Sequence, residues 1–263
     1  MMYLLFFTIC FGASIIGAIC GIGGGVIIKP VLDATGVMNV ATVSFLSGCT
    51  VLAMTTYSVI KGKISRDSHV ELKIGVPLGF GAAVGGLVGK QLFSLISNVT
   101  VNKNMVGAVQ AICLICVTIG TFLFTIFKKQ IRTYHIQGSM LCIVIGLAMG
   151  IMSSFLGIGG GPINLVILFF FFSMPTKIAA EYSLYIIFFS QLASLGTYLI
   201  TDSVPDFSLK TLILMVAGGI LGGICGRAIS KRINERIVNR LFLGIMVIII
   251  GINIYNAYKF IVI

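Results

Sequence analysis

Charged residues are scarce in this sequence, and acidic residues are the scarcest. Only 10% of the 263 residues are charged, whereas soluble domains carry about 25%. Seven acidic residues stand against 18 basic ones, and 58% of the chain is hydrophobic. No long polar stretch separates the apolar segments. This composition excludes a soluble enzyme and leaves no room for a soluble catalytic or nucleic-acid-binding domain.

Complete motifs for metal, redox or nucleophilic chemistry are also missing. His69 and His135 stand alone in polar loops without the spacing of metal ligands. Cys113 and Cys116 form a single CxxC, but it lies inside an apolar segment, where a thiol behaves as a small hydrophobic group. We see no nucleophile–base pair. We therefore expect no enzyme activity, no metal, no cofactor and no nucleic-acid partner.

Long apolar segments fill the chain instead. Ten can be distinguished, and all but 26–32 and 162–173 are long enough to cross a hydrocarbon core about 30 Å thick. We predict an all-α polytopic membrane protein of the cell (plasma or inner) membrane. The excess of Lys and Arg over Asp and Glu then reflects which loops face the cytoplasm. The first segment lacks a basic flank and a cleavage pattern, so we expect it to be retained. The segments are 2–20, 26–32, 42–60, 74–96, 105–127, 137–156, 162–173, 178–200, 211–229 and 241–260.

The motif Gly-Ile-Gly-Gly-Gly occurs twice, at 21–25 and 157–161, and each copy directly precedes one of the short segments. The copies lie 136 residues apart, just over half the chain. Two series of three glycines, each spaced by four residues, also occur, and the second series lies 137 residues after the first. We call these series the glycine ladders. We predict an internal duplication with a first repeat at 1–127, a linker at 128–137 and a second repeat at 138–263. The ladders are Gly81, Gly85, Gly89 and Gly218, Gly222, Gly226.

The glycine ladders favour close helix packing in lipid, without contact to a substrate. Lys90 and Arg227 follow the two ladders at equivalent positions, close to the ends of their apolar segments. We interpret both as anchors at the membrane interface, and their symmetry leaves a gating role open.

The basic residues of the loops indicate how the chain crosses the membrane. The loops 61–73, 128–135 and 227–240 hold four, three and five, whereas 97–104 and 201–210 hold one each. Loops rich in basic residues lie on the cytoplasmic side of the membrane. The loops can be placed in this way only if each short segment and the apolar segment before it form a hairpin, which enters the membrane and returns to the side from which it entered. We therefore predict two inverted-topology repeats, each a glycine-broken hairpin helix plus three transmembrane helices, an arrangement typical of secondary transporters.

The glycine clusters predict breaks in helices at the depth of the membrane, where irregular backbone must line a cavity or be buried in protein. The unpaired N–H groups at the start of each following helix can bind an anion without a charged side chain. Two such starts near the midplane would hold a small oxyanion. The alternative is that these glycines only permit tight hairpin packing. The candidates are Gly23, Gly24, Gly25, Gly159, Gly160 and Gly161.

Three polar residues near the breaks are further candidates, each with an alternative. Lys29 could bind the anion or extend its ammonium to the interface. Asn164 could donate to the anion or cap a neighbouring helix. Glu181 could carry a coupling proton, but we favour an ion pair with Lys177, one turn earlier.

The duplicated motif, followed in the second copy by Pro162, resembles the sulfite exporter TauE/SafE family of bacterial membrane transporters over about residues 5–258. The resemblance implies a secondary carrier for sulfite, sulfonates or related organic acids. The resemblance also implies that the site residues of the family correspond here to the two glycine triplets, 23–25 and 159–161. The family's Gly-Thr-Ser-Leu stretch after each hairpin is replaced here by 43–46 and 181–184, so Ser183 is retained and Ser44 is a partial match.

The hypothesis is a carrier that holds a small anion at the paired breaks and alternates access between the two sides. Protons or the membrane potential would drive it. The alternatives are a passive small-solute channel, with the breaks as a constriction, and a scaffold that transports nothing. The expected partners are the small anionic substrate and the lipid bilayer, and a homo-oligomer is left open.

Overall fold

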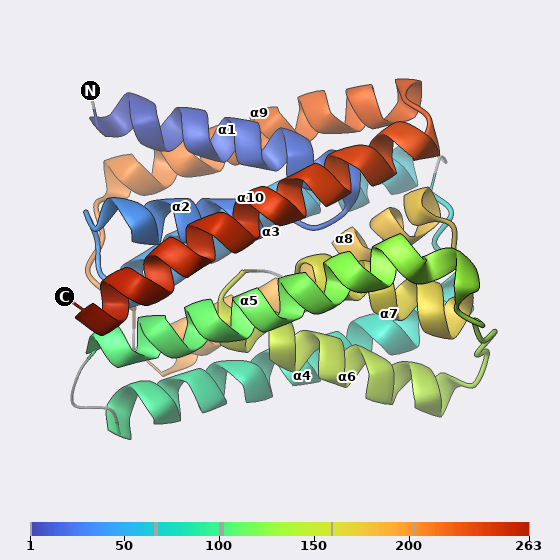
Figure 1. Cartoon of the computed structure of the whole chain (residues 1–263), viewed down its shortest axis with the longest axis horizontal. Coiled ribbons are helices and arrows are strands. Elements are labelled where there is room, and N and C mark those ends of the chain that lie inside the picture. The colour runs from blue at the N-terminus through green and yellow to red at the C-terminus, as the bar shows by residue number, and fades with distance from the viewer. Residues whose placement is uncertain (1, 66–67, 100–102, 159, 202–203, 263) are drawn as a thin grey trace.

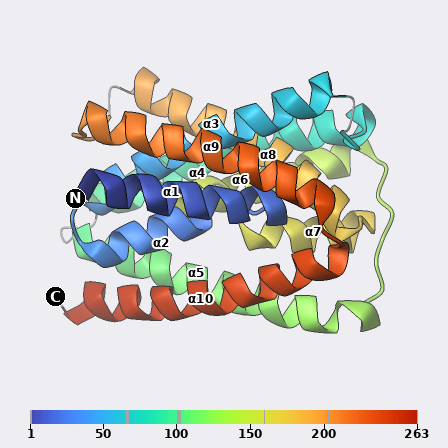
Figure 2. The same cartoon turned by 90° about the horizontal axis from the view of Figure 1, so that it is seen from above.

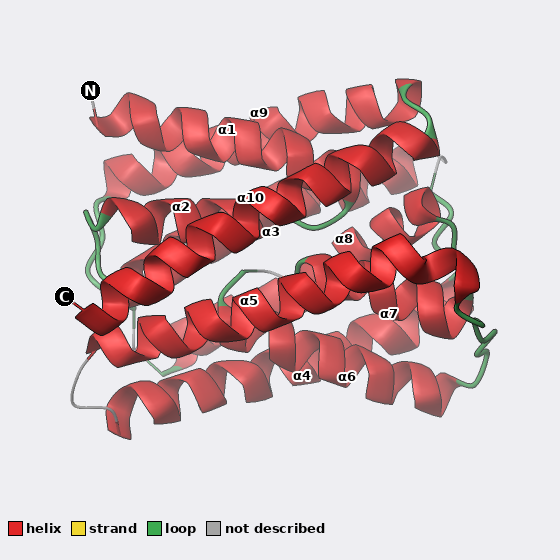
Figure 3. Ribbon diagram, in the orientation of Figure 1, coloured by secondary structure: helices red, strands yellow, loops and turns green. Residues whose placement is uncertain are grey.

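The computed structural model describes residues 2–65, 68–99, 103–158, 160–201 and 204–262, and this part of the chain contains helices and no strand (Figure 3). A single 3-10 turn, η1 (Lys128–Gln130), follows the fifth helix. The α-helices are α1 (Met2–Cys20), α2 (Gly25–Thr35), α3 (Val40–Ile64), α4 (Leu72–Val99), α5 (Lys103–Phe127), α6 (Ser139–Leu156), α7 (Pro162–Phe172), α8 (Thr176–Ile200), α9 (Leu209–Arg232) and α10 (Glu235–Val262).

Eight of these helices are long and apolar enough to cross a membrane. The two others, α2 and α7, have 11 residues each and coincide with the segments that the sequence marks as too short to span. The prediction of an all-helical, multi-pass membrane protein is therefore confirmed. The bounds of α2 differ from the prediction, because the helix continues from the apolar segment through Asp33 to Thr35.

Each short helix follows a glycine break, and α2 packs on α1, α3 and α10 whereas α7 packs on α8 and α5. Local signals fix the ends of these helices. Pro162 occupies the first turn of α7, where its missing N–H would have no partner anyway. Gly36 ends α2 with a φ of 66°, a left-handed conformation that glycine adopts without strain. Asn39 then starts α3 by accepting a hydrogen bond from the Thr42 N–H at 2.8 Å.

The glycine ladders join helices from different halves of the chain. The first ladder packs α4 along α6, and the second packs α9 along α1. A Cβ on Gly85 would lie 2.2 Å from the Leu147 carbonyl oxygen, and a Cβ on Gly222 would lie 2.4 Å from that of Phe11. The interpretation of the ladders as packing surfaces is confirmed, because only glycine allows this approach of two backbones.

The loops gather at two ends of the bundle (Figures 1 and 2). At one end, the Thr176 N–H donates to Glu235 at 2.7 Å and the Lys128 ammonium donates to Asn239 at 3.2 Å. The basic loops that follow α3, α5 and α9 all lie at this end. Both termini lie at the other end, which also holds the loop between α8 and α9. The α1–α2 hairpin enters from the end with the termini, and the α6–α7 hairpin enters from the basic end (Figure 1).

Candidate functional site

The two glycine breaks touch each other inside the bundle. A Cβ on Gly25 would lie 2.3 Å from the carbonyl oxygen of Ile158, so only glycine lets the start of α2 reach the second break. Gly161 has a φ of 70°, and its Cβ would lie 2.8 Å from a methyl carbon of Val26. The predicted meeting of the two breaks is therefore present in the structure.

The other predicted glycines shape the same two turns. Gly23 and Gly160 have φ angles of 68° and 110°, in the left-handed region. The Gly24 carbonyl accepts the first hydrogen bonds of α2, from the N–H groups of Ile27 and Ile28. Gly159 lies outside the described residues.

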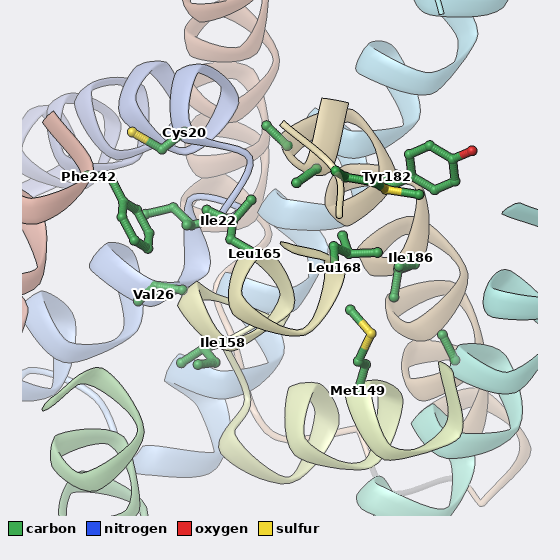
Figure 4. Close-up of a cluster of buried hydrophobic side chains, with 14 of the residues drawn as sticks. Cys20, Ile22, Val26, Met149, Ile158, Leu165, Leu168, Tyr182, Ile186 and Phe242 are labelled. Carbon is green, nitrogen blue, oxygen red and sulfur yellow. The ribbon is translucent and has the colours of Figure 1, made fainter. Parts of the chain in front are cut away.

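Apolar side chains fill the crossing of the breaks (Figure 4). Ile22, Val26 and Ile158 are fully buried there, and Leu165 packs with them in the same core cluster. In this conformation, the space between the two helix starts is therefore packed core. An anion held there would have to displace Val26 or Ile158.

Lys29 is buried beside the crossing and forms an ion pair within α2. Its ammonium lies 2.7 Å from Asp33 Oδ2, one turn later, and its side chain is only 1% exposed. The alternative that Lys29 reaches the membrane interface is therefore wrong. A Cβ on Gly157 would lie 3.3 Å from Lys29 Cε and 3.0 Å from Ser44 Oγ, so these three residues are neighbours. Asp33 was not predicted from the sequence, although its spacing of four residues from Lys29 is the signal for such a pair.

Asn164 and Ser183 form a second buried polar group. The Asn164 amide donates to Ser183 Oγ at 3.4 Å, so within the described residues it bonds to a side chain of α8 and not to the end of a helix. Both side chains are fully buried. The Asn164 amide oxygen and Ser44 Oγ have no hydrogen-bond partner in the described part of the chain.

Glu181 does not pair with Lys177, so the favoured interpretation is wrong. Its carboxylate accepts a hydrogen bond from the His69 backbone N–H at 2.8 Å and lies 3.2 Å from the His69 ring. The Lys177 ammonium instead donates to the Ser230 carbonyl at 3.0 Å, near the end of α9. Carbonyl groups at a helix C-terminus attract a cation, and this contact draws Lys177 away from the carboxylate.

Lys90 is a buried residue, and its interpretation as an interface anchor is wrong. Its side chain is 7% exposed, because α4 continues to Val99 and α8 covers this face. The ammonium lies 3.6 Å from the centroid of the Tyr198 ring and 4.7 Å from that of Phe93. Lys90 forms no ion pair within the described residues.

A small polar cavity surrounds the Lys90 ammonium, and we call it the Lys90 pocket. Its volume of about 20 Å³ has room for about one water molecule. Gly157 contributes to its wall, so the pocket adjoins the second break. Two of its polar atoms, Ser44 Oγ and Gln110 Oε1, have no hydrogen-bond partner in the residues described. The lining residues are Ser44, Lys90, Phe93, Gln110, Ser154, Gly157, Gln191, Ser194, Leu195 and Tyr198.

Two larger cavities, of about 280 and 410 Å³, adjoin each other through four shared residues, and we call them together the Arg227 vestibule. Arg227 is half-buried in their common wall, where its guanidinium donates to the Ser58 carbonyl at 3.0 Å. Arg227 lies five residues before the end of α9, and its interpretation as an interface anchor stays a prediction. Lys63, His69, Lys177 and Lys231 give the vestibule a basic rim. The shared residues are Ser58, Glu181, Leu184 and Arg227.

Comparison with known proteins identifies the family of this chain. The family model described as sulfite exporter TauE/SafE matches residues 6–254. The probable membrane transporter protein YunE of Bacillus subtilis (strain 168) is 25% identical over 219 residues, which cover 73% of this chain and 76% of that protein. The resemblance inferred from the duplicated motif is confirmed. This chain belongs to the sulfite exporter TauE/SafE family and is a multi-pass membrane transporter.

Proposed function

We propose that the protein moves a small anion, a sulfur oxyanion such as sulfite or a sulfonate or a related organic acid, by alternating access. The anion binds in the Lys90 pocket, beside the paired glycine breaks. The observation that carries the proposal is the Lys90 ammonium, which is buried next to Gly157 and Ser44 without a carboxylate partner in the described chain.

The two buried lysines, Lys29 and Lys90, differ in how their charges are compensated, and this difference distinguishes the proposed site from a structural ion pair. Lys29 is neutralised within its own helix by Asp33. The Lys90 ammonium lies over the faces of two aromatic rings and has no carboxylate partner among the described residues, and each ring contact contributes roughly 0.5–2 kcal/mol. Burying a charge costs several kcal/mol when no opposite charge compensates it. An anion that enters the pocket supplies this opposite charge, and Ser44 can donate a further hydrogen bond.

The glycine breaks provide the wall and the hinge of this site. Gly157 belongs to the second break and lines the pocket, and the starts of α2 and α7 lie within contact of each other. The pocket is too small for an oxyanion in this conformation. Binding therefore requires the elements around it to separate, which a carrier does in each cycle.

We propose that the two halves, 1–127 and 138–263, form inverted-topology repeats. Two observations support this proposal. The hairpins enter from opposite ends of the bundle (Figure 1), and the packing of α4 on α6 is matched by that of α9 on α1. Sites at the interface of inverted repeats are typical of secondary transporters. The basic loops would then face the cytoplasm in the plasma membrane.

Coupling can come from the membrane potential or from Glu181. A potential that is negative inside favours anion export by about 2.3 kcal/mol per charge per 100 mV. Glu181 lies in the wall of the vestibule and its side chain is 32% exposed, so a proton can reach it from that side. We propose Glu181 as the coupling residue if protons take part.

Flux measurements in liposomes test the proposal. The purified protein is reconstituted, and uptake of radiolabelled sulfite is measured with and without unlabelled sulfite inside. Uptake that saturates, and that is accelerated by internal sulfite, supports a carrier. Uptake proportional to concentration, without counterflow, would indicate the channel alternative. If sulfite does not move, the same assay with methanesulfonate and small carboxylates decides whether another anion does, and no flux for any of them would overturn the proposal.

A further inference from the structure

We propose that Lys90 and Arg227 are equivalent anion-binding residues, one for each side of the membrane, and that Tyr198 and Phe93 form a gate over Lys90. This inference rests on the proposed anion transport and extends it to a second cation and a lid. In this structure the Arg227 vestibule is wide, with cavities of about 280 and 410 Å³, and the Lys90 pocket is narrow, at about 20 Å³.

The duplication relates the two cavities residue by residue. The helices α4 and α9 begin at Leu72 and Leu209, and this displacement of 137 residues aligns Lys90 with Arg227. The helices α3 and α8 have 25 residues each and align at a displacement of 136. The ends of α1 and α6, just before the two breaks, align at the same displacement of 136.

Most residues of the Lys90 pocket have their equivalents in the Arg227 vestibule. The agreement of the two linings under the repeat is a property of the fold. It indicates that the two cavities are copies of one site in different states. The matched pairs, pocket residue first, are Lys90 with Arg227, Phe93 with Ser230, Ser44 with Ala180, Ser154 with Ala18, Ser194 with Ser58, Leu195 with Val59, and Tyr198 with Gly62.

The two copies differ most at the aromatic residues that contact the cation. Tyr198 and Phe93 place their rings at 3.6 and 4.7 Å from the Lys90 ammonium. Their equivalents in the vestibule, Gly62 and Ser230, have no ring. This difference accounts for a pocket of about 20 Å³ on one side and cavities of about 280 and 410 Å³ on the other.

The face of an aromatic ring carries partial negative charge, so Tyr198 and Phe93 stand in for an anion while the pocket is empty. A substrate anion that approaches Lys90 must displace the Tyr198 ring, and the ring returns when the anion leaves. Arg227 needs no such lid in this state, because the wide vestibule lets water solvate its guanidinium. The cycle then passes the anion between two cations that have no carboxylate partner in the described chain.

The geometry also indicates that a substitution at Gly62 could place an aromatic ring over Arg227. A Cβ on Gly62 would lie 3.4 and 3.5 Å from the two terminal nitrogens of Arg227, at ordinary van der Waals distance. Gly62→Ala is therefore tolerated. Gly62→Tyr adds a ring that can cover the guanidinium, as Tyr198 covers Lys90.

Accessibility of matched cysteines tests the proposal. Ser58→Cys and Ser194→Cys place one thiol in each copy of the site, in a background whose seven native cysteines are replaced and which retains wild-type sulfite flux. The probe is a membrane-impermeant methanethiosulfonate that carries a sulfonate. We expect Ser58→Cys to react from the side of the basic loops, and Ser194→Cys to react slowly from either side.

The gate variants then change these rates in opposite directions. Tyr198→Leu should raise labelling of Ser194→Cys about tenfold, from the side of the α8–α9 loop, whereas Tyr198→Phe keeps the ring and the slow rate. Gly62→Tyr should lower labelling of Ser58→Cys by a similar factor, about tenfold, and Gly62→Ala should not. Labelling rates that are unchanged in both Tyr198→Leu and Gly62→Tyr would overturn the proposal.

Flux in the chain with its native cysteines provides a second measurement that needs no altered background. We expect Lys90→Gln and Arg227→Gln each to reduce sulfite counterflow at least about tenfold. Normal counterflow in either variant would overturn the pairing of the two cations and leave anion transport itself intact. Absence of flux for every anion in the wild type would instead overturn the proposed function.

Discussion

The Lys90 ammonium lies 3.6 Å from the centre of the Tyr198 ring, inside the protein and without a carboxylate partner in the described residues. A buried cation that lies over aromatic faces without an opposite charge is costly for stability. Its presence in a transporter of this family is explained most simply if an anion completes the site during transport.

Neutralising Lys90 should therefore impair transport without impairing folding. We expect Lys90→Gln to lose at least about tenfold in sulfite flux, because a charge-assisted contact to the anion is removed. Its melting temperature in detergent should equal or exceed that of the wild type, because an uncompensated charge is also removed. A clearly lower melting temperature would show that the ammonium stabilises the fold. Lys210→Gln makes the same chemical change at an exposed lysine and serves as the control.

The pair of Lys29 and Asp33 should behave in the opposite way. Lys29→Met leaves the buried Asp33 carboxylate unpaired and should destabilise the protein by about 3–5 kcal/mol. The double variant Lys29→Met with Asp33→Leu should recover most of that loss and retain flux. Thermal unfolding and sulfite uptake of the three proteins check both statements. A stable double variant without flux would place Lys29 in contact with the anion.

Contact between the breaks can be tested at Gly25. A methyl group there would meet the Ile158 carbonyl oxygen at 2.3 Å, and this oxygen belongs to the backbone, so it cannot swing aside as the end of a flexible side chain could. Gly25→Ala should therefore lower stability by about 1–3 kcal/mol, the range for overpacking a core. Gly120→Ala is the matched control, because open space surrounds Gly120 within α5, and it should raise stability by up to about 1 kcal/mol. Equal melting temperatures for the two variants would contradict the close approach.

Proton coupling through Glu181 makes a further prediction. If this carboxylate carries the proton, Glu181→Gln should transport sulfite at a rate that no longer responds to an imposed pH gradient. The response to an imposed membrane potential should remain. The pair with His69 is partly exposed, and exposed pairs contribute about 0–1 kcal/mol, so stability should change little. A mutant that keeps its response to pH would remove Glu181 from the coupling path.

The sequence was sufficient to predict the main features of the fold. The lengths of the apolar segments identified the spanning helices and the two short ones. The spacing of the ladder glycines identified the surfaces that join α4 to α6 and α9 to α1. These predictions succeed because helix length in a bilayer and close approach at glycine are local properties of the chain.

The site was harder to predict, because it depends on contacts between distant residues. Lys90 looks like an anchor near a helix end until Tyr198 of α8 is placed over it, 108 residues later in the chain. Glu181 takes a partner in the loop before α4, and no pattern in the sequence favours that residue over Lys177. Asp33 was the exception, since its spacing from Lys29 was visible within one helix turn.

Equilibrium binding of radiolabelled sulfite to the purified protein tests the central claim most directly. Wild type, Lys90→Gln and the control Lys210→Gln are titrated at the same ionic strength. The proposal predicts saturable binding at the Lys90 pocket in the wild type and in Lys210→Gln, and affinity at least about tenfold weaker at that pocket in Lys90→Gln, while binding at Arg227 remains. Equal affinity in all three proteins would contradict the assignment of the anion to the Lys90 pocket.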